Sequence, residues 1–175
     1  MNKVLRFTAP VILIGAVLYL VIITLIDQAG ESLGNLPSWT SRTILLAVTT
    51  IAIVRYRIKN NNLITFREGM LVGMVAAMIV GIVIALHTFI YRSYIRPTYN
   101  QEMKDLVAQN LALQVNEEGE KLWKPEQIER QVNQQWGTFF TTKGGVIIDL
   151  LGALGLGLLA STSVSYMARR VRVKD

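Results

Sequence analysis

The chain has no cysteine and only one histidine among its 175 residues. Without cysteine the protein can form neither disulfides nor thiolate metal sites. A single histidine, His87, leaves no histidine cluster for zinc. Gly152, Gly155 and Gly157 form no phosphate-binding loop, because they lie inside an apolar run. We therefore expect no metal and no cofactor.

Catalytic signatures are missing as well. Ser161 and Ser163 have no histidine base at their depth in the predicted helix, which excludes a serine hydrolase. Asp149 and His87 alone are too few polar groups for an intramembrane protease. We predict that the protein is not an enzyme.

Polar residues are scarce in four long stretches of the chain. An apolar stretch of roughly 18 or more residues can cross the ~30 Å hydrocarbon layer of a membrane, whereas a soluble domain interleaves polar residues at the period of its helices or strands. The four stretches are Phe7–Ile26, Trp39–Val54, Gly69–Ile90 and Gly144–Met167. They predict an all-α membrane protein with four transmembrane helices, in which residues 1–175 form a single domain.

Two of these stretches leave an alternative open. Trp39–Val54 is the shortest, at 16 residues, and also fits a buried or interfacial helix. Phe7–Ile26 follows Lys3 and Arg6, as the apolar region of a signal peptide would. Its 20 residues exceed the usual length of such a region, and no clear small-residue cleavage site follows. We therefore favour an uncleaved membrane helix.

Charge is distributed unevenly around these stretches. The two termini and the loop after the second stretch carry ten of the bases and only two acids, Glu68 and Asp175. The other connections carry eight bases, and ten acids if Asp27 and Asp149 are counted. By the positive-inside rule both termini are cytoplasmic, which agrees with an even number of crossings. The net charge of +6 thus reflects topology and contact with anionic lipid. We expect the lipid bilayer as a partner, and no nucleic acid.

Small residues recur at every fourth position in the third and fourth stretches. This spacing lets two helix backbones approach closely, and its simplest use is to pack the two helices together in one protomer. The alternative is homo-oligomerisation through one of the two ridges, as we call these rows of small residues. A four-residue step drifts about 40° per repeat around a helix, so no straight partner is expected to follow the whole series in the third stretch. The two series are Gly69, Gly73, Ala77, Gly81 and Ala85, and Gly145, Asp149, Ala153, Gly157, Ser161 and Ser165.

The third stretch has a defined start and end. Thr65 and Glu68 have the spacing of a capping box, in which each side chain accepts a hydrogen bond from the other residue's backbone N–H. This predicts a helix that begins at Phe66. At the other end, Tyr91 and Tyr94 are placed as anchors at the membrane–water interface.

The connection between the third and fourth stretches, residues 97–143, is polar and is predicted to lie outside the cytoplasm. Its apolar residues at helical spacing predict an amphipathic helix of roughly four turns. These residues are Tyr99, Met103, Leu106, Val107 and Leu111. After a break at residues 117–119, a second helix is expected to start at Pro125 and to carry Ile128, Val132 and Trp136 on one face. The apolar stripes would pack on each other, lie at the bilayer surface or dock a partner.

His87 and Asp149 are ionisable residues inside predicted spans, where such groups tend to face a bundle interior, a cavity or a partner. His87 lies five residues before Arg92, and Asp149 lies six residues after Lys143, so both are within about two turns of the outer surface. We expect the two side chains to contact each other or to share a water. The pair would act as a polar clamp that orients two helices, which we favour, or as a proton or cation site.

Three segments connect the chain to a family. They are RYRIK at residues 55–59, LITFREGMLVG at residues 63–73 and FIYRSYIRPTYNQEM at residues 89–103. With them the sequence resembles, over most of its length, the bacterial four-helix inner-membrane family catalogued as domain of unknown function number 4199. The resemblance implies an inner-membrane location and an amphipathic segment before the last helix. It implies no activity, since none is established for the family.

Two functions are open on this reading. We favour a non-catalytic structural or accessory subunit of the inner membrane that packs with itself, as a homo-oligomer, or with another membrane protein. The alternative is a small proton- or cation-coupled transporter or channel subunit that uses His87 and Asp149. A wet cavity that joins these residues to the cytoplasm would indicate transport, whereas a tightly packed bundle would favour the accessory role.

Overall fold

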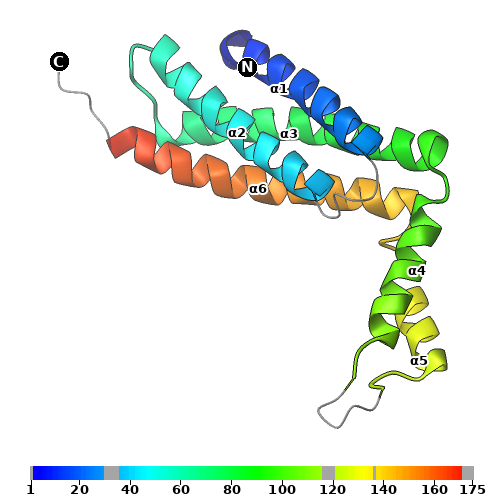
Figure 1. Cartoon of the computed structure of the whole chain (residues 1–175). Coiled ribbons are helices and arrows are strands. Elements are labelled where there is room, and N and C mark those ends of the chain that lie inside the picture. Colours follow the sequence, from blue (N-terminus) through cyan, green and yellow to red (C-terminus); the bar gives the residue numbers. More distant parts are fainter. Residues whose placement is uncertain (1, 30–35, 116–120, 136, 171–175) are drawn as a thin grey trace. The chain divides into compact units, whose positions relative to one another are not determined.

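The computed structural model describes residues 2–29, 36–115, 121–135 and 137–170, and every regular element in these ranges is a helix (Figure 1). The prediction of an all-helical chain is therefore confirmed. Two of the elements, η2 and η3, are short π-helical turns. In chain order the elements are α1 (Asn2–Ala29), α2 (Leu36–Lys59), α3 (Phe66–Ile90), η2 (Tyr91–Ile95), α4 (Tyr99–Ala112), α5 (Pro125–Arg130), η3 (Gln131–Gln135) and α6 (Thr142–Arg170).

Three candidate spans among the described residues are long and apolar enough to cross a membrane. They are Arg6–Ile26 in α1, Phe66–Ile95 in α3 and η2, and Thr142–Ala168 in α6. These spans correspond to the first, third and fourth apolar stretches of the sequence. The second stretch lies in α2, a helix of 24 residues.

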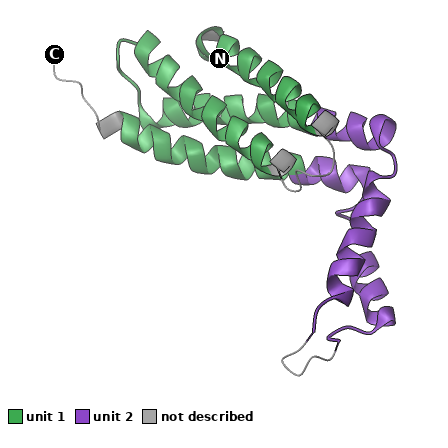
Figure 2. Ribbon diagram, viewed as in Figure 1, with its two compact units in different colours: residues 1–84, 149–175 green, residues 85–148 purple. Residues whose placement is uncertain are grey.

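The chain divides into two compact units (Figure 2). Unit 1 consists of residues 1–84 and 149–175, and unit 2 of residues 85–148. Unit 1 therefore holds α1, α2 and most of α3 and α6. Unit 2 holds the last turns of α3, the segment at residues 97–143 and the start of α6. The prediction of one domain for the whole chain stays a prediction.

Unit 1 has apolar side chains both inside and outside. Ile53, Val72 and Val80 are fully buried in its core. Leu13 and Leu159, in contrast, are 65% and 66% exposed. A helix that faces water carries polar residues on its outer side, so this pattern is typical of helices surrounded by lipid.

Two buried threonine hydroxyls in unit 1 are hydrogen-bonded within their own helices. Thr8 and Thr49 each donate to the backbone carbonyl oxygen four residues earlier, at 2.8 Å. This bond satisfies a polar group that would be costly to bury alone. These side chains therefore fit an apolar environment without a partner from another helix.

The segment at residues 97–143 of unit 2, called the cap below, contains a pair of helices, α4 and α5. The sequence predicts a first helix of roughly four turns, and α4 has 14 residues. The sequence also predicts a second helix that starts at Pro125, and α5 starts at this residue. Val132 is buried and Ile128 is half-buried on the face that the sequence predicts. The predicted break at residues 117–119 and the side chain of Trp136 lie outside the described residues.

Candidate functional site

The small residues of α3 and α6 meet at four successive levels in unit 1. At each level one partner is a glycine, and a Cβ atom added to that glycine would collide with the side chain opposite. The facing pairs are Gly69–Ser165, Gly73–Ser161, Ala77–Gly157 and Gly81–Ala153. Each four-residue step along α3 is matched by a four-residue step back along α6. The two helices therefore run antiparallel in constant register, and the expected drift does not separate their ridges over these four levels.

The remaining small residues of the two series have other surroundings. Ala85, the fifth of the α3 series, is buried and belongs to unit 2. Gly145, the first of the α6 series, also belongs to unit 2, where it lies against the guanidinium group of Arg92. The small residues thus make two kinds of contact: close packing of α3 on α6 in unit 1, and accommodation of the Arg92 side chain in unit 2.

His87 and Asp149 lie in separate units, so their predicted contact stays a prediction. The His87 ring stacks on the Tyr91 ring, with centroids 5.9 Å apart and an interplanar angle of 21°. Both His87 and Asp149 are partly exposed. Within the described ranges, no three His, Asp or Glu side chains gather where they could hold a metal ion.

Arg92 ties the C-terminal end of α3 to the starts of α4 and α6. Its Nη1 donates to Asn100 Oδ1 at 3.3 Å and to the Thr141 carbonyl oxygen at 3.4 Å. The guanidinium carbon lies 5.0 Å from the centroid of the Tyr99 ring, in a cation–π arrangement. Gly145 leaves the space that the guanidinium group occupies, since a Cβ atom there would collide with it.

The sequence analysis did not predict that Arg92 would connect these three helices. Two signals pointed to it. One is a basic residue directly after an apolar span, followed within two turns by Tyr99 and Asn100. The other is the Gly144–Gly145 pair at the start of the fourth stretch. Neither signal identifies the other as its partner, because the two lie about 50 positions apart in the chain.

The N-terminal end of α3 has the predicted capping box. The Thr65 backbone N–H donates to Glu68 Oε2 at 2.9 Å, and the Glu68 backbone N–H donates to Thr65 Oγ1 at 3.2 Å. Capping is therefore confirmed as a role of Glu68.

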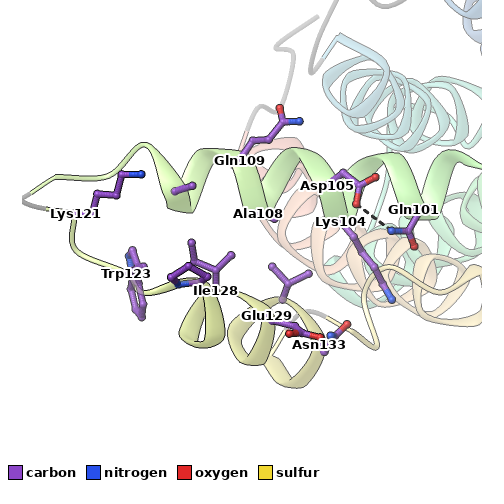
Figure 3. Close-up of a pocket in the computed structure, with 13 residues that line it drawn as sticks. Gln101, Lys104, Asp105, Ala108, Gln109, Lys121, Trp123, Ile128, Glu129 and Asn133 are labelled. Atoms are coloured by element: carbon purple, nitrogen blue, oxygen red, sulfur yellow. Dashed lines mark hydrogen bonds between the residues drawn. The ribbon is translucent and has the colours of Figure 1, made fainter.

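Unit 2 contains an open groove between α4 and the α5–η3 segment (Figure 3). Its volume is about 670 Å³, within the range of ligand pockets. Ala108, Ile128 and Val132 supply apolar lining, and Trp123 is held at one end because its indole N–H donates to Gln114 Oε1 at 2.9 Å. The charged residues of the lining have both signs. They are Lys104, Lys121, Asp105 and Glu129.

A known protein family matches most of the chain. Residues 7–170 match the protein family described as "Protein of unknown function (DUF4199)", which confirms the family resemblance seen in the sequence. No curated protein and no solved structure matches the chain.

Proposed function

We infer that this chain, which belongs to the DUF4199 family of proteins of unknown function, is a non-catalytic structural or accessory subunit of the bacterial inner membrane. In this proposal both termini are cytoplasmic and residues 97–143 lie outside. The observation that supports the role is the contact between α3 and α6 at four levels. Two of the most apolar helices are thereby used for close packing, which leaves no passage between their facing surfaces.

The proposal includes α2 as a fourth membrane crossing. Its 24 residues extend over about 36 Å, longer than the ~30 Å hydrocarbon layer. The helix packs closely on α1, where Gly15 lies against Val48. Its exposed positions include Leu46, Ile51 and Val54, which suit contact with lipid and not with water.

The accessory role is tested by purifying the tagged full-length chain in a mild detergent and measuring the mass of the intact assembly. We expect a fixed number of copies, or a second membrane protein at fixed stoichiometry, at several protein concentrations. A mock purification from cells without the tagged chain controls for carried-over proteins. A monomer without any partner under all these conditions would contradict the proposal.

A second candidate function is a proton- or cation-coupled transporter or channel subunit. Its support is that His87 lies in the candidate span Phe66–Ile95 and Asp149 in Thr142–Ala168, where ionisable residues are costly. Vesicles containing the purified chain and a pH-sensitive dye would measure proton flux after a pH jump. Flux that is lost in both His87→Gln and Asp149→Asn would establish transport. Flux equal to that of empty vesicles would leave the accessory role.

A further inference from the structure

The two sides of α4 differ in what covers them. Gln101, Lys104 and Ala108 line the groove that faces α5 (Figure 3). Leu106 lies two residues from both Lys104 and Ala108, which places it roughly 200° away from them around the helix. It is 48% exposed, and Leu113, seven residues further on the same side, is 77% exposed. Leu106 and Leu113 therefore lie on a side of α4 that α5 leaves open, whereas Met103, Val107 and Leu111 are half-buried.

The position of α4 in the chain keeps it close to the membrane surface. The candidate span Phe66–Ile95 ends four residues before α4 begins, and the cap returns to another candidate span at Thr142. Tyr94 and Ile95, just before α4, are 74% and 65% exposed. Within unit 2, α4 runs steeply across the direction of the last turns of α3 (Figure 2). If those turns cross the bilayer, α4 runs along its surface.

We propose that α4 is an interfacial helix, with Leu106 and Leu113 among the lipid headgroups of the outer leaflet and the groove turned toward water. The inference rests on the membrane insertion of the proposed function. It selects the bilayer among the three uses that the sequence left open for the apolar stripes. Amphipathic helices of this kind bury their apolar face at the boundary between headgroups and acyl chains.

The polar residues beside this stripe are compatible with the headgroup region. Glu102 forms an ion pair with Arg96 at 2.6 Å and accepts a hydrogen bond from the Thr98 hydroxyl at 2.6 Å. Asn110 is exposed, and headgroups and their water can hydrate its amide, which hydrocarbon could not. Tyr94 has the amphipathic ring that is enriched at this depth.

Single-cysteine labelling tests the proposal, because the natural chain contains no cysteine. Leu106→Cys, Gln101→Cys and Leu159→Cys are each labelled with a fluorophore in the full-length protein and reconstituted into phosphatidylcholine–phosphatidylglycerol vesicles. Quenching is measured with lipids that carry a nitroxide near the headgroup and with aqueous iodide. We expect the Leu106 label to be quenched by the nitroxide lipid roughly twofold or more above the Gln101 label, and the reverse order with iodide.

Each other result has a defined meaning. If iodide reaches the Leu106 and Gln101 labels equally, the stripe faces water and the proposal is overturned. If neither quencher reaches the Leu106 label, protein covers the stripe, either a second copy or a partner, and the proposal is again overturned. The Leu159 label reports on insertion, since Leu159 is exposed in the middle of α6, and it is measured with lipids that carry the nitroxide deep in the acyl chain. If nitroxide lipids fail to quench it, the proposed membrane function itself fails. If they quench it but spare the Leu106 label, only the interfacial helix fails.

Discussion

Ser161 and Ser165 lie one turn apart on α6 and both face glycines of α3, but they differ in one hydrogen bond. The Ser161 hydroxyl donates to the Gly157 carbonyl oxygen. The Ser165 hydroxyl is fully buried and has no hydrogen-bond partner in the part of the chain that the structure describes. In an isolated helix, a serine hydroxyl can donate a hydrogen bond to a backbone carbonyl oxygen of the preceding turn. In the folded protein Ser161 makes this hydrogen bond, whereas Ser165 is buried without it.

Replacing Ser165 should therefore stabilise the protein. We expect Ser165→Ala to raise the free energy of unfolding in mixed detergent micelles by about 1 kcal/mol, because the substitution removes an unpaired buried group. Ser161→Ala is the matched control and should leave this free energy unchanged or lower it. Circular dichroism during titration with a denaturing detergent measures both. Equal stabilisation by the two substitutions would count against this account of Ser165.

Glu102 gives a residue-scale prediction outside the membrane spans. The Thr98 hydroxyl, and then the Arg96 guanidinium, hold the pKa of Glu102 below its ordinary value of 4.5. A carboxyl with a lowered pKa stabilises the folded state above its unfolded pKa, and the contribution is lost as the pH falls through the folded pKa.

Removing the first of these causes should be visible in a titration. Thr98→Val is expected to raise the pKa of Glu102 toward its ordinary value, whereas Thr98→Ser, which keeps the hydroxyl, should not change it. Carbon-13 NMR of the Glu102 carboxyl as a function of pH measures this pKa. An unshifted titration in Thr98→Val would show that the hydroxyl has no influence on it.

At the scale of the helix pair, the contact between α3 and α6 can be tested with two glycines, one in a crowded position and one in an open position. A Cβ atom at Gly73 would collide with the side chain of Ser161 and approach Ile53 Cδ1 to 2.9 Å, whereas a Cβ atom at Gly152 of α6 would meet nothing within 4 Å. Overpacking of a tight contact typically costs about 1–3 kcal/mol. An alanine in an open helix position is favourable by up to about 1 kcal/mol relative to glycine.

Gly73→Ala should therefore lower the free energy of unfolding, and Gly152→Ala should leave it unchanged or raise it. Unfolding in mixed micelles measures both variants against the natural chain. The explanation of the ridge as a packing surface fails if Gly73→Ala is tolerated as well as Gly152→Ala.

Helix boundaries could be predicted from the sequence where their causes are local. The capping box of Thr65 and Glu68 and the proline at position 125 each act within a single turn, and α3 and α5 begin where these residues place them. The small-residue ridges could also be recognised in the sequence, because their spacing is a local pattern. The register between the two ridges could not be predicted, because a repeated spacing does not determine which glycine faces which residue of the other helix.

Apart from the pairing of α3 with α6, contacts between distant segments could not be predicted. The bond from Arg92 to Thr141 joins residues 49 positions apart, and it depends on a path through the cap that no local pattern specifies. The amphipathic pattern of α4 likewise did not reveal which of its faces meets α5. The structure places Ala108 toward α5 and leaves Leu106 exposed, because the smaller residue allows the closer approach of the two helices.

At the scale of the whole molecule, the two units differ in the kind of surface they expose. Unit 1 exposes many large apolar side chains along α1, α2, α3 and α6, as lipid-facing helices do. The cap in unit 2 combines charged residues around its groove with a few exposed leucines, which suits the boundary between lipid and water. This division makes the number of crossings decisive, because it determines the side of the membrane on which the cap lies.

Four crossings and three crossings predict opposite locations for two loops. If α2 crosses and the N-terminus is cytoplasmic, Leu63 lies in the cytoplasm and Glu126 lies outside. If only the three candidate spans cross, Leu63 lies outside and Glu126 inside. Both side chains are exposed, so Leu63→Cys and Glu126→Cys in this cysteine-free chain are accessible sites for a thiol reagent.

We expect a membrane-impermeant maleimide to label Glu126→Cys in intact cells and to label Leu63→Cys only after the membrane is permeabilised. The reason is that the basic residues around Leu63, including Arg57, Lys59 and Arg67, favour the cytoplasmic side. The extent of labelling on each variant before and after permeabilisation is the measurement, and each variant serves as the control for the other. The reversed pattern would overturn the proposed topology, because it requires either that α2 stays on one side of the membrane or that both termini lie outside.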